Sequence, residues 1–347
     1  MEELNLEHDY CCPGCDTQPQ GADLGRRTVI GGIAALAASS LGIAQAKKVK
    51  IGTCGQFLCL VPYEVAKRRG YFQEQGLDVE IIWAKGGTQA LQFMIGGAVD
   101  YSATSLDAVL QARQRGAKVV QVASSGRLPL FALATAPKTA GAIQAVKDLA
   151  GRTVAVSGLG NADHLMLQYL LKRAGVDPKG VQYATIGTNL FEALKQGQVE
   201  AGMVQEPALS LLKEAGGREL VNLMDFNQAK AFMGGPYAFM GLNIRSEERD
   251  ARAGEIRRIA KAIEKGIQFV QTARANVIVD SLPKELIVGG DRKQLEAIID
   301  RYRRSLYQSS LKLDRDAAER TVDIQQAAGV LPAGFKVDEA LDFGILG

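Results

Sequence analysis

Residues 63–113 have the sequence YEVAKRRGYFQEQGLDVEIIWAKGGTQALQFMIGGAVDYSATSLDAVLQAR. This pattern predicts a helix, a strand, a second helix, a short strand and a third helix. Residues 78–83 (DVEIIW) are mostly β-branched and apolar, as a buried parallel strand requires. Residues 86–88 (GGT) begin the second helix, residues 100–104 form the short strand, and Ser105 has the position of a helix N-cap. We therefore expect an α/β fold.

Three strand-to-helix junctions should meet at one edge of the sheet in this part of the chain. They are residues 53–57, 86–88 and 102–105. Open α/β sheets bind ligands beyond the carboxyl ends of their strands, where such junctions gather. The sequence therefore predicts half of a site for a small polar ligand.

The remaining strands and helices suggest a second lobe of similar build. Strands are expected at residues 49–53, 119–125 and 131–135, and residues 136–145 are small and loop-like, as a crossing between lobes would be. Second-lobe strands are expected at residues 153–156, 181–186 and 201–204, a return strand at 238–244, and helices packing on the first lobe at 253–271 and 295–306. Residues 157–161 (SGLGN) open a helix whose free N–H groups suit a carboxylate, sulfonate or nitrate.

The segments GYFQEQGLDVEI, the GG-T helix start and GGAVDYSATS resemble the nitrate/sulfonate/taurine-type solute-binding proteins of ABC importers. Some relatives in that family handle the thiamine pyrimidine precursor. The resemblance runs from about Lys48 to the end. It implies a type II periplasmic binding protein with mixed sheets and a ligand cleft between two lobes. The expected lobes are residues 47–137 with 237–347, and residues 138–236.

The resemblance also implies a function: capture of a small solute by lobe closure, for an inner-membrane permease and its ATPase. We expect a monomer that is not an enzyme and carries no cofactor or metal. The candidate ligand-binding residues of the first lobe are Thr53, Cys54, Gln56, Phe57, Gly87, Thr88, Ser102, Thr104 and Ser125. Those of the second lobe are Ser157, Asn161, Thr188 and Glu206. In this family an E-P pair faces the cleft, although Gln205 and Glu206 could equally serve the helix that follows them.

Residues 1–46 have the features of an export signal. Arg26 and Arg27 form a twin-arginine pair, a weakly apolar run covers residues 29–43, and residues 44–46 (AQA) form a cleavage site. We expect Tat export to the periplasm with cleavage after Ala46. Residues 1–46 hold two of the 41 basic and six of the 38 acidic residues, so the remainder carries 39 − 32 = +7.

This positive balance mildly favours an anionic ligand such as a sulfonate, while relatives in the family bind pyrimidines on the same scaffold. No basic stripe with interleaved aromatics is present, so nucleic acid is not an expected partner. The chain has one tryptophan, Trp83, which we expect in the core, and no run of aromatics that would stack on a heterocycle. Arg127 could reach an anion from the fourth strand's end, and His164 could reach the cleft, although each is more often structural.

Five cysteines raise an alternative function. Cys11, Cys12 and Cys15 precede the signal and should be lost with it. Cys54 and Cys59 could form a disulfide, stay as buried thiols, or make Cys54 a nucleophile near a helix N-terminus. The last possibility resembles a bacterial desulfinase that cleaves an aromatic sulfinate on this fold. A cysteine-dependent enzyme is therefore the first alternative, and a sensory solute-binding protein is the second.

Overall fold

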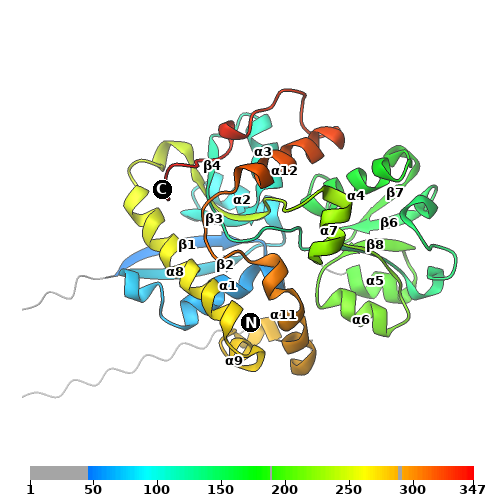
Figure 1. Cartoon of the computed structure of the whole chain (residues 1–347), viewed down its shortest axis with the longest axis horizontal. Helices are drawn as coiled ribbons and strands as arrows, with labels where there is room; N and C mark the ends of the chain where they lie inside the picture. The colour runs from blue at the N-terminus through cyan, green and yellow to red at the C-terminus, as the bar shows by residue number, and fades with distance from the viewer. Residues whose placement is uncertain (1–45, 188–189, 288–290) are drawn as a thin grey trace, which may run out of the picture. The chain divides into compact units, whose positions relative to one another are not determined.

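The computed structural model describes residues 46–187, 190–287 and 291–347. Residues 44–347 form one compact unit, and the expected signal segment with its three cysteines lies outside the described residues. Within the described part of the chain, no helix is both long and apolar enough to span a membrane. Figure 1 shows the strands and helices of the unit.

The first lobe is built on a five-stranded mixed sheet in the order β2-β1-β3-β10-β4. Its strands are β1 (Lys47–Thr53), β2 (Leu77–Trp83), β3 (Tyr101–Ser105), β4 (Val119–Ser124) and β10 (Met240–Arg245). Strand β1 is parallel to β2 and β3, while β10 is antiparallel to β3 and β4. The connecting helices are α1 (Phe57–Arg68), α2 (Gly87–Ile95) and α3 (Leu106–Gln114).

The second lobe has its own mixed sheet in the order β7-β6-β8-β5-β9. Its strands are β5 (Ala132–Thr135), β6 (Thr153–Val156), β7 (Gln182–Thr185), β8 (Ala201–Val204) and β9 (Glu219–Asn222). Its helices are α4 (Ala162–Arg173), α5 (Leu190–Gln196), α6 (Ala208–Glu214) and α7 (Phe226–Met233). The predicted two-lobed α/β fold with mixed sheets is therefore confirmed.

The chain crosses between the lobes earlier than the sequence suggested. Strand β5 was expected in the first lobe, before a crossing at residues 136–145. It instead pairs antiparallel with β8 and β9, so it belongs to the second sheet. All four residues of β5 are buried, and such a short apolar strand fits the middle of either sheet, so only long-range pairing decides its place. We call residues 125–131 the first crossing and residues 234–239 the second crossing.

The C-terminal helices contact both lobes. They are α8 (Ala253–Thr272), α9 (Ala275–Asp280), α10 (Lys284–Ile287), α11 (Arg292–Leu306) and α12 (Arg315–Ala327). Helix α8 packs on α1 of the first lobe as expected, while α12 packs against both α3 and α4. In α11 the Tyr302 hydroxyl accepts a hydrogen bond of 2.9 Å from Asn222 Nδ2 of the second sheet. These helices therefore add to the links that the two crossings provide.

Short 3-10 helices complete the described secondary structure: η1 (Gln73–Gln75), η2 (Pro137–Thr139), η3 (Val146–Leu149), η4 (Pro178–Gly180), η5 (Ser246–Glu248) and η6 (Val337–Glu339).

One core prediction is wrong. Trp83 lies at the end of strand β2 with 39% of its surface exposed. Its indole Nε1 donates a 3.0 Å hydrogen bond to the Glu64 carboxylate, which satisfies the polar end of the ring.

Candidate functional site

A cavity lies where the two lobes meet, in a space of about 450 Å³ that includes open solvent. The three expected junctions of the first lobe contribute to it, together with residues of the second lobe and of both crossings. Its lining consists of Cys54, Gln56, Gly86, Gly87, Thr88, Thr104, Ser105, Ala108, Leu130, Phe131, Ser157, Asn161, Ala162, Asp163, Gln205, Phe239 and Met240. Seven of the candidate ligand-binding residues are in this set: Cys54, Gln56, Gly87, Thr88, Thr104, Ser157 and Asn161.

The first-lobe side of the cavity presents hydrogen-bond donors. Helix α2 begins there after its N-cap Gly86, with no side-chain cap and no acidic residue in its first turn. Its first N–H groups therefore face the cavity with the positive end of the helix dipole. A Cβ atom on Gly87 would lie 2.3 Å from Thr104 Oγ1, so only glycine fits there. That hydroxyl is fully buried and has no hydrogen-bond partner.

The second-lobe side of the cavity presents a carboxylate at the start of α4. Asp163 is buried in the first turn of α4 and accepts hydrogen bonds from Ser157 N and, at 2.8 Å, from Ser157 Oγ. The N–H of Gly160 donates to His164 Nδ1 at 3.1 Å. These side chains occupy the N–H groups of Ser157 and Gly160, which precede α4. The N-cap Asn161 makes no side-chain bond to the first N–H groups of α4, so anion binding at this helix start stays a prediction.

Burial raises the pKa of Asp163, because the charged carboxylate is poorly solvated there, while the hydrogen bonds from Ser157 oppose the rise. A hydrogen-bond donor or a cation on a ligand would stabilise the charged form of this group. The signal for Asp163 in the sequence is weak, because an acidic residue in a helix's first turn is usually a capping group.

Two hydrogen bonds join the lobes beside the cavity. Thr88 Oγ1 donates to Asn161 Oδ1 at 2.7 Å, and both residues line the cavity. Gln111 Nε2 of helix α3 donates to the carbonyl oxygen of Gly160, also at 2.7 Å. Gln111 does not line this cavity but a neighbouring apolar groove. The two bonds therefore hold the lobes together, one inside the cavity and one outside it.

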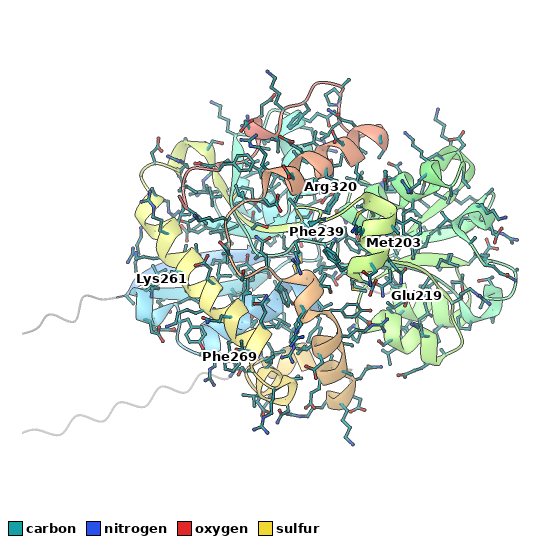
Figure 2. The ribbon with its side chains drawn as sticks, viewed as in Figure 1. Met203, Glu219, Phe239, Lys261, Phe269 and Arg320 are labelled. Carbon is teal, nitrogen blue, oxygen red and sulfur yellow. A yellow bond between two sulfur atoms is a disulfide. The ribbon has the colours of Figure 1, made fainter. Side chains whose placement is uncertain are left out.

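An apolar corner forms the remaining wall. Phe131 of the first crossing and Phe239 of the second pack edge to face, with ring centroids 5.7 Å apart and planes at 88°. Leu130 and Met240 extend this wall. Phe239 is labelled in Figure 2, together with Met203 of strand β8 in the second lobe. The sequence analysis missed these two phenylalanines, because each is a single aromatic residue in a segment without a periodic pattern.

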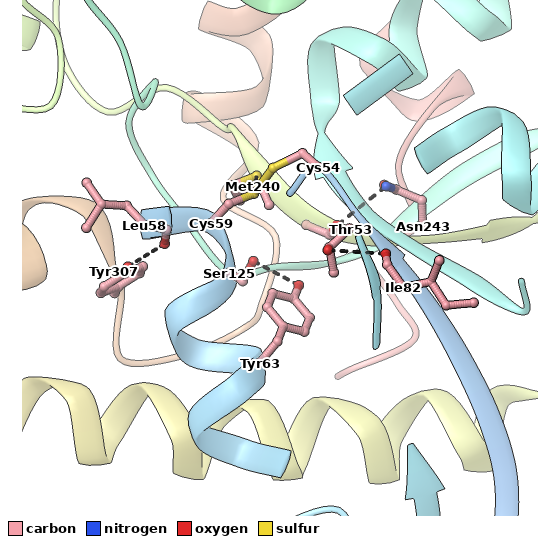
Figure 3. The surroundings of a disulfide bond; sticks show 11 residues. Thr53, Cys54, Leu58, Cys59, Tyr63, Ile82, Ser125, Met240, Asn243 and Tyr307 are labelled. Carbon is pink, nitrogen blue, oxygen red and sulfur yellow. Dashed lines mark hydrogen bonds between the residues drawn. A yellow bond between two sulfur atoms is a disulfide. The ribbon is translucent and has the colours of Figure 1, made fainter. Parts of the chain in front are cut away.

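Four candidate residues of the first lobe lie outside the cavity lining. Thr53 Oγ1 donates to the carbonyl oxygen of Ile82 at 3.4 Å, and Ser125 Oγ pairs with the Tyr63 hydroxyl at 3.1 Å, as Figure 3 shows. Ser102 Oγ accepts a hydrogen bond from Asn243 Nδ2 at 3.3 Å. Phe57 is packed in the core. Position near a strand end therefore did not ensure that these groups reached the cavity, because each hydroxyl is held by a neighbour within the first lobe.

A second pocket adjoins the cavity and shares five lining residues with it: Gln56, Phe131, Ser157, Asp163 and Gln205. Glu206 lines this second pocket and accepts hydrogen bonds from Ser210 N at 3.0 Å and Ser210 Oγ at 3.1 Å. Burial raises its pKa. Thr188 lies outside the described residues. Among the described residues that line the two pockets, none is Lys, Arg or His.

Cys54 and Cys59 are bonded as a disulfide, with Cα atoms 7.0 Å apart (Figure 3). Cys54 lines the cavity, and the sulfur of Met240 lies 3.2 Å from that of Cys59. Of the three alternatives for this pair, the structure therefore has the disulfide. A disulfide-bonded Cys54 has no thiolate, which removes the nucleophile that a cysteine-dependent enzyme would need.

Arg127 and His164 have structural roles. Arg127 donates to the backbone carbonyls of Arg304 and Ser305 at the end of α11, at 2.6 and 3.0 Å. His164 packs edge to face on Tyr183 at 4.7 Å, and burial lowers its pKa. Across residues 46–187, 190–287 and 291–347, no group of three or more His, Cys, Asp or Glu side chains is placed to hold a metal ion.

Comparison with known proteins places the chain in a family. The model of the NMT1/THI5-like family matches residues 60–273. The chain belongs to the NMT1/THI5-like family. A relative in Bacillus subtilis (strain 168), named "Putative binding protein YtlA", is 23% identical over 82% of this chain and 84% of its own length. The formylaminopyrimidine-binding protein of Halalkalibacterium halodurans is 30% identical over 40% of this chain and 41% of its own length.

The fold agrees with this family assignment. The solved alkanesulfonate-binding protein SsuA of Xanthomonas axonopodis pv. citri, bound to MOPS, superposes with a TM-score of 0.69. The match covers 86% of this chain and 99% of the other at 20% identity. At that identity the similarity shows the fold, which is that of periplasmic binding proteins.

Proposed function

We propose that this chain is the substrate-binding component of an ABC importer. It captures a small solute outside the cytoplasm by closing its two lobes, and it delivers the solute to a membrane permease with an ATPase. The observation that carries this proposal is the cavity between the lobes, lined by polar groups of both and spanned by hydrogen bonds between them. The binding-protein fold and the family relatives named for binding support it.

The lining of the cavity favours a dipolar solute over a simple anion. Donors at the start of α2 and the free hydroxyl of Thr104 suit an acceptor group on one end of the ligand. Asp163 suits a donor or cationic group on the other end, and the Phe131–Phe239 corner suits an apolar body between them. The +7 balance of residues 47–347 affects encounter and solubility, while the cavity itself offers no cationic side chain among its described residues.

Two solute classes have this arrangement of groups. An aminosulfonate such as taurine carries acceptor oxygens at one end and an ammonium at the other. An aminopyrimidine carries ring-nitrogen acceptors and exocyclic amino donors on an aromatic body. Nitrate and simple alkanesulfonates lack the donor, so they would make no hydrogen bond to Asp163, whose oxygens would keep their bonds from Ser157.

The ligand contacts that we propose come from both lobes. On the first lobe they are Gln56, Gly87, Thr88 and Thr104, with Cys54 in the wall. On the second lobe they are Ser157, Asn161 and Asp163. Glu206 and Gln205 would contact only a ligand long enough to enter the second pocket.

Thermal unfolding of the full chain against matched ligand pairs tests this proposal. The first pair is taurine and ethanesulfonate, which differ by the amine, and the second is an aminopyrimidine and the same ring without its amino group. A ligand at about 100 times its Kd adds about 2.7 kcal/mol and raises the melting temperature by several degrees.

We expect one amine-bearing member to raise the melting temperature and its partner to leave it unchanged. If ethanesulfonate or nitrate stabilises the protein as strongly, the argument for a dipolar ligand is wrong but solute binding stands. If no small solute in a wider panel binds, the binding-protein proposal itself fails.

A further inference from the structure

A buried carboxylate joins three elements behind the cavity. Asp107 lies in the first turn of α3 and is 1% exposed. Its Oδ1 accepts a 2.6 Å hydrogen bond from the hydroxyl of Tyr237 in the second crossing. The same oxygen accepts a 3.1 Å hydrogen bond from Gln325 Nε2 of α12. This cluster therefore links the first lobe to a crossing and to a helix that also packs on the second lobe.

Two oxygens in this cluster are fully buried and lack a hydrogen-bond partner: Asp107 Oδ2 and Gln325 Oε1. An ionised carboxylate and an amide oxygen are both acceptors, so neither can satisfy the other. A proton on Asp107 Oδ2 changes this. A carboxylic acid beside a carboxamide can form two parallel hydrogen bonds, and the bond from Gln325 Nε2 to Oδ1 is already present. One proton would then satisfy both buried oxygens.

No cation compensates a negative charge on Asp107 among the described residues. Tyr237 of the crossing and Gln325 of α12 bond the Asp107 carboxylate, and Gln111 of the same helix bonds the Asp107 backbone carbonyl. None of these three side chains is positively charged. Thr321 and Arg320 of α12 instead donate to the carbonyl oxygens of Ala238 and Pro236. Tyr237 keeps its own proton, because burial and the neighbouring Asp107 raise the pKa of its hydroxyl. The hydroxyl of Tyr169 of α4 is a further neighbour of Tyr237. Burial likewise raises the pKa of Asp107, to about 7.

We propose that Asp107 of α3 is a proton-binding site beside the second crossing. The bound proton is shared with Gln325 and holds α3, the crossing and α12 together. Loss of the proton leaves an uncompensated charge between these elements, so the fold becomes less stable as pH rises. Ligand affinity should also fall as pH rises, because Ser105, Ala108 and Phe239 of the same segments line the cavity. That effect on affinity rests on the proposed function, whereas the effect on stability does not.

The direction and size of the effect follow from proton linkage. An unfolded aspartate titrates near 3.8, whereas Asp107 in the folded protein titrates at about 7. The contribution of Asp107 to stability is therefore complete below about pH 4 and is lost progressively as pH rises to about 7. Between pH 5 and pH 8 the folding equilibrium constant should fall about a hundredfold through this group alone, and most of that fall should be complete by pH 7.

Urea unfolding of the full chain at pH 5 and pH 8 tests this, in the wild type and in Asp107→Asn. The asparagine can make the same contacts as the protonated acid without titrating. The ratio of wild-type to variant folding constants should fall about a hundredfold between the two pH values. The matched control is Asp323→Asn, an exposed position on α12, for which the ratio should stay constant. A ratio for Asp107→Asn that changes less than threefold would overturn the proposal.

Carbon NMR of wild-type protein labelled at the aspartate carboxyls gives an answer even if Asp107→Asn does not fold. We expect one carboxyl still protonated at pH 6, and we expect it to persist in Asp163→Asn, which removes the buried aspartate of the cavity. If every aspartate carboxyl has finished titrating by pH 5, or if the signal disappears in Asp163→Asn, the assignment to Asp107 is wrong. Neither measurement needs a ligand, so failure of the proposed function would not imitate either outcome.

Discussion

Replacing Gln111 with methionine would isolate lobe closure from ligand contact. Gln111 Nε2 donates to the carbonyl oxygen of Gly160 across the lobes at 2.7 Å, but the side chain does not line the cavity. Methionine keeps the length and most of the volume of the side chain and removes the donor. The variant should therefore weaken the closed arrangement without changing any proposed contact between protein and solute.

The size of the effect follows from the single bond removed. A neutral hydrogen bond contributes about 0.5–1.5 kcal/mol net. Gly160 is only half-buried in the closed arrangement, so its carbonyl oxygen can accept a bond from water in the variant, and the full penalty for a buried unpaired oxygen does not apply. If binding requires closure, affinity falls by the same free energy, which is about 2- to 12-fold in Kd.

Isothermal titration calorimetry on wild type, Gln111→Met and Gln114→Met would measure this loss. Gln114 is an exposed residue on the same helix and serves as the matched control, with an unchanged Kd expected. The loss for Gln111→Met should be the same factor for every solute that binds, because the bond reports on closure alone. An unchanged Kd, or a loss that differs between solutes by more than threefold, would refute the reasoning.

Three further predictions concern groups inside the cavity. Asp163→Asn should weaken an amine-bearing solute more than tenfold and leave the binding of a solute without the amine nearly unchanged, as titration calorimetry on the matched pairs would show. Gly87→Ala should lower the free energy of unfolding by about 1–3 kcal/mol, because its Cβ would lie 2.3 Å from Thr104 Oγ1. Adding Thr104→Ala should restore much of that loss in urea melts, and a purely additive double variant would contradict the clash. Thr88→Ala and Asn161→Ala should each weaken binding by about 1–3 kcal/mol, and an unchanged Kd in both would show that neither residue contacts the solute.

Much of the local structure could be predicted because local patterns determine it. Strands β6 and β8 have the limits that were expected, and helix α11 includes the whole predicted segment. Ser105 is the N-cap of α3, with its hydroxyl accepting from Ala108 N as its position suggested. Such features depend on side chains within a few residues of one another, so their pattern is visible in the sequence.

The candidate site was only partly predictable, because strand alternation and the crossings select which groups reach the cavity. Seven candidate residues meet there, while the hydroxyls of Thr53, Ser102 and Ser125 bond to neighbours within the first lobe. Whether a strand-end hydroxyl faces the cavity depends on the face to which its Cβ points. Phe131 and Phe239 come from opposite crossings, and no sequence spacing could place them edge to face.

By itself, then, the sequence determined the order and type of the elements, the family and the general position of a cleft, because these depend on periodicity and on motifs within short segments. Only the tertiary structure decided that β5 joins the second sheet and that the start of α4 is occupied by Asp163. It also brought Asp107 together with Tyr237 and Gln325, which lie 130 and 218 residues away in the chain. Each of these arrangements depends on pairing between distant segments, whose free energy comes from burial and hydrogen bonding in the folded protein.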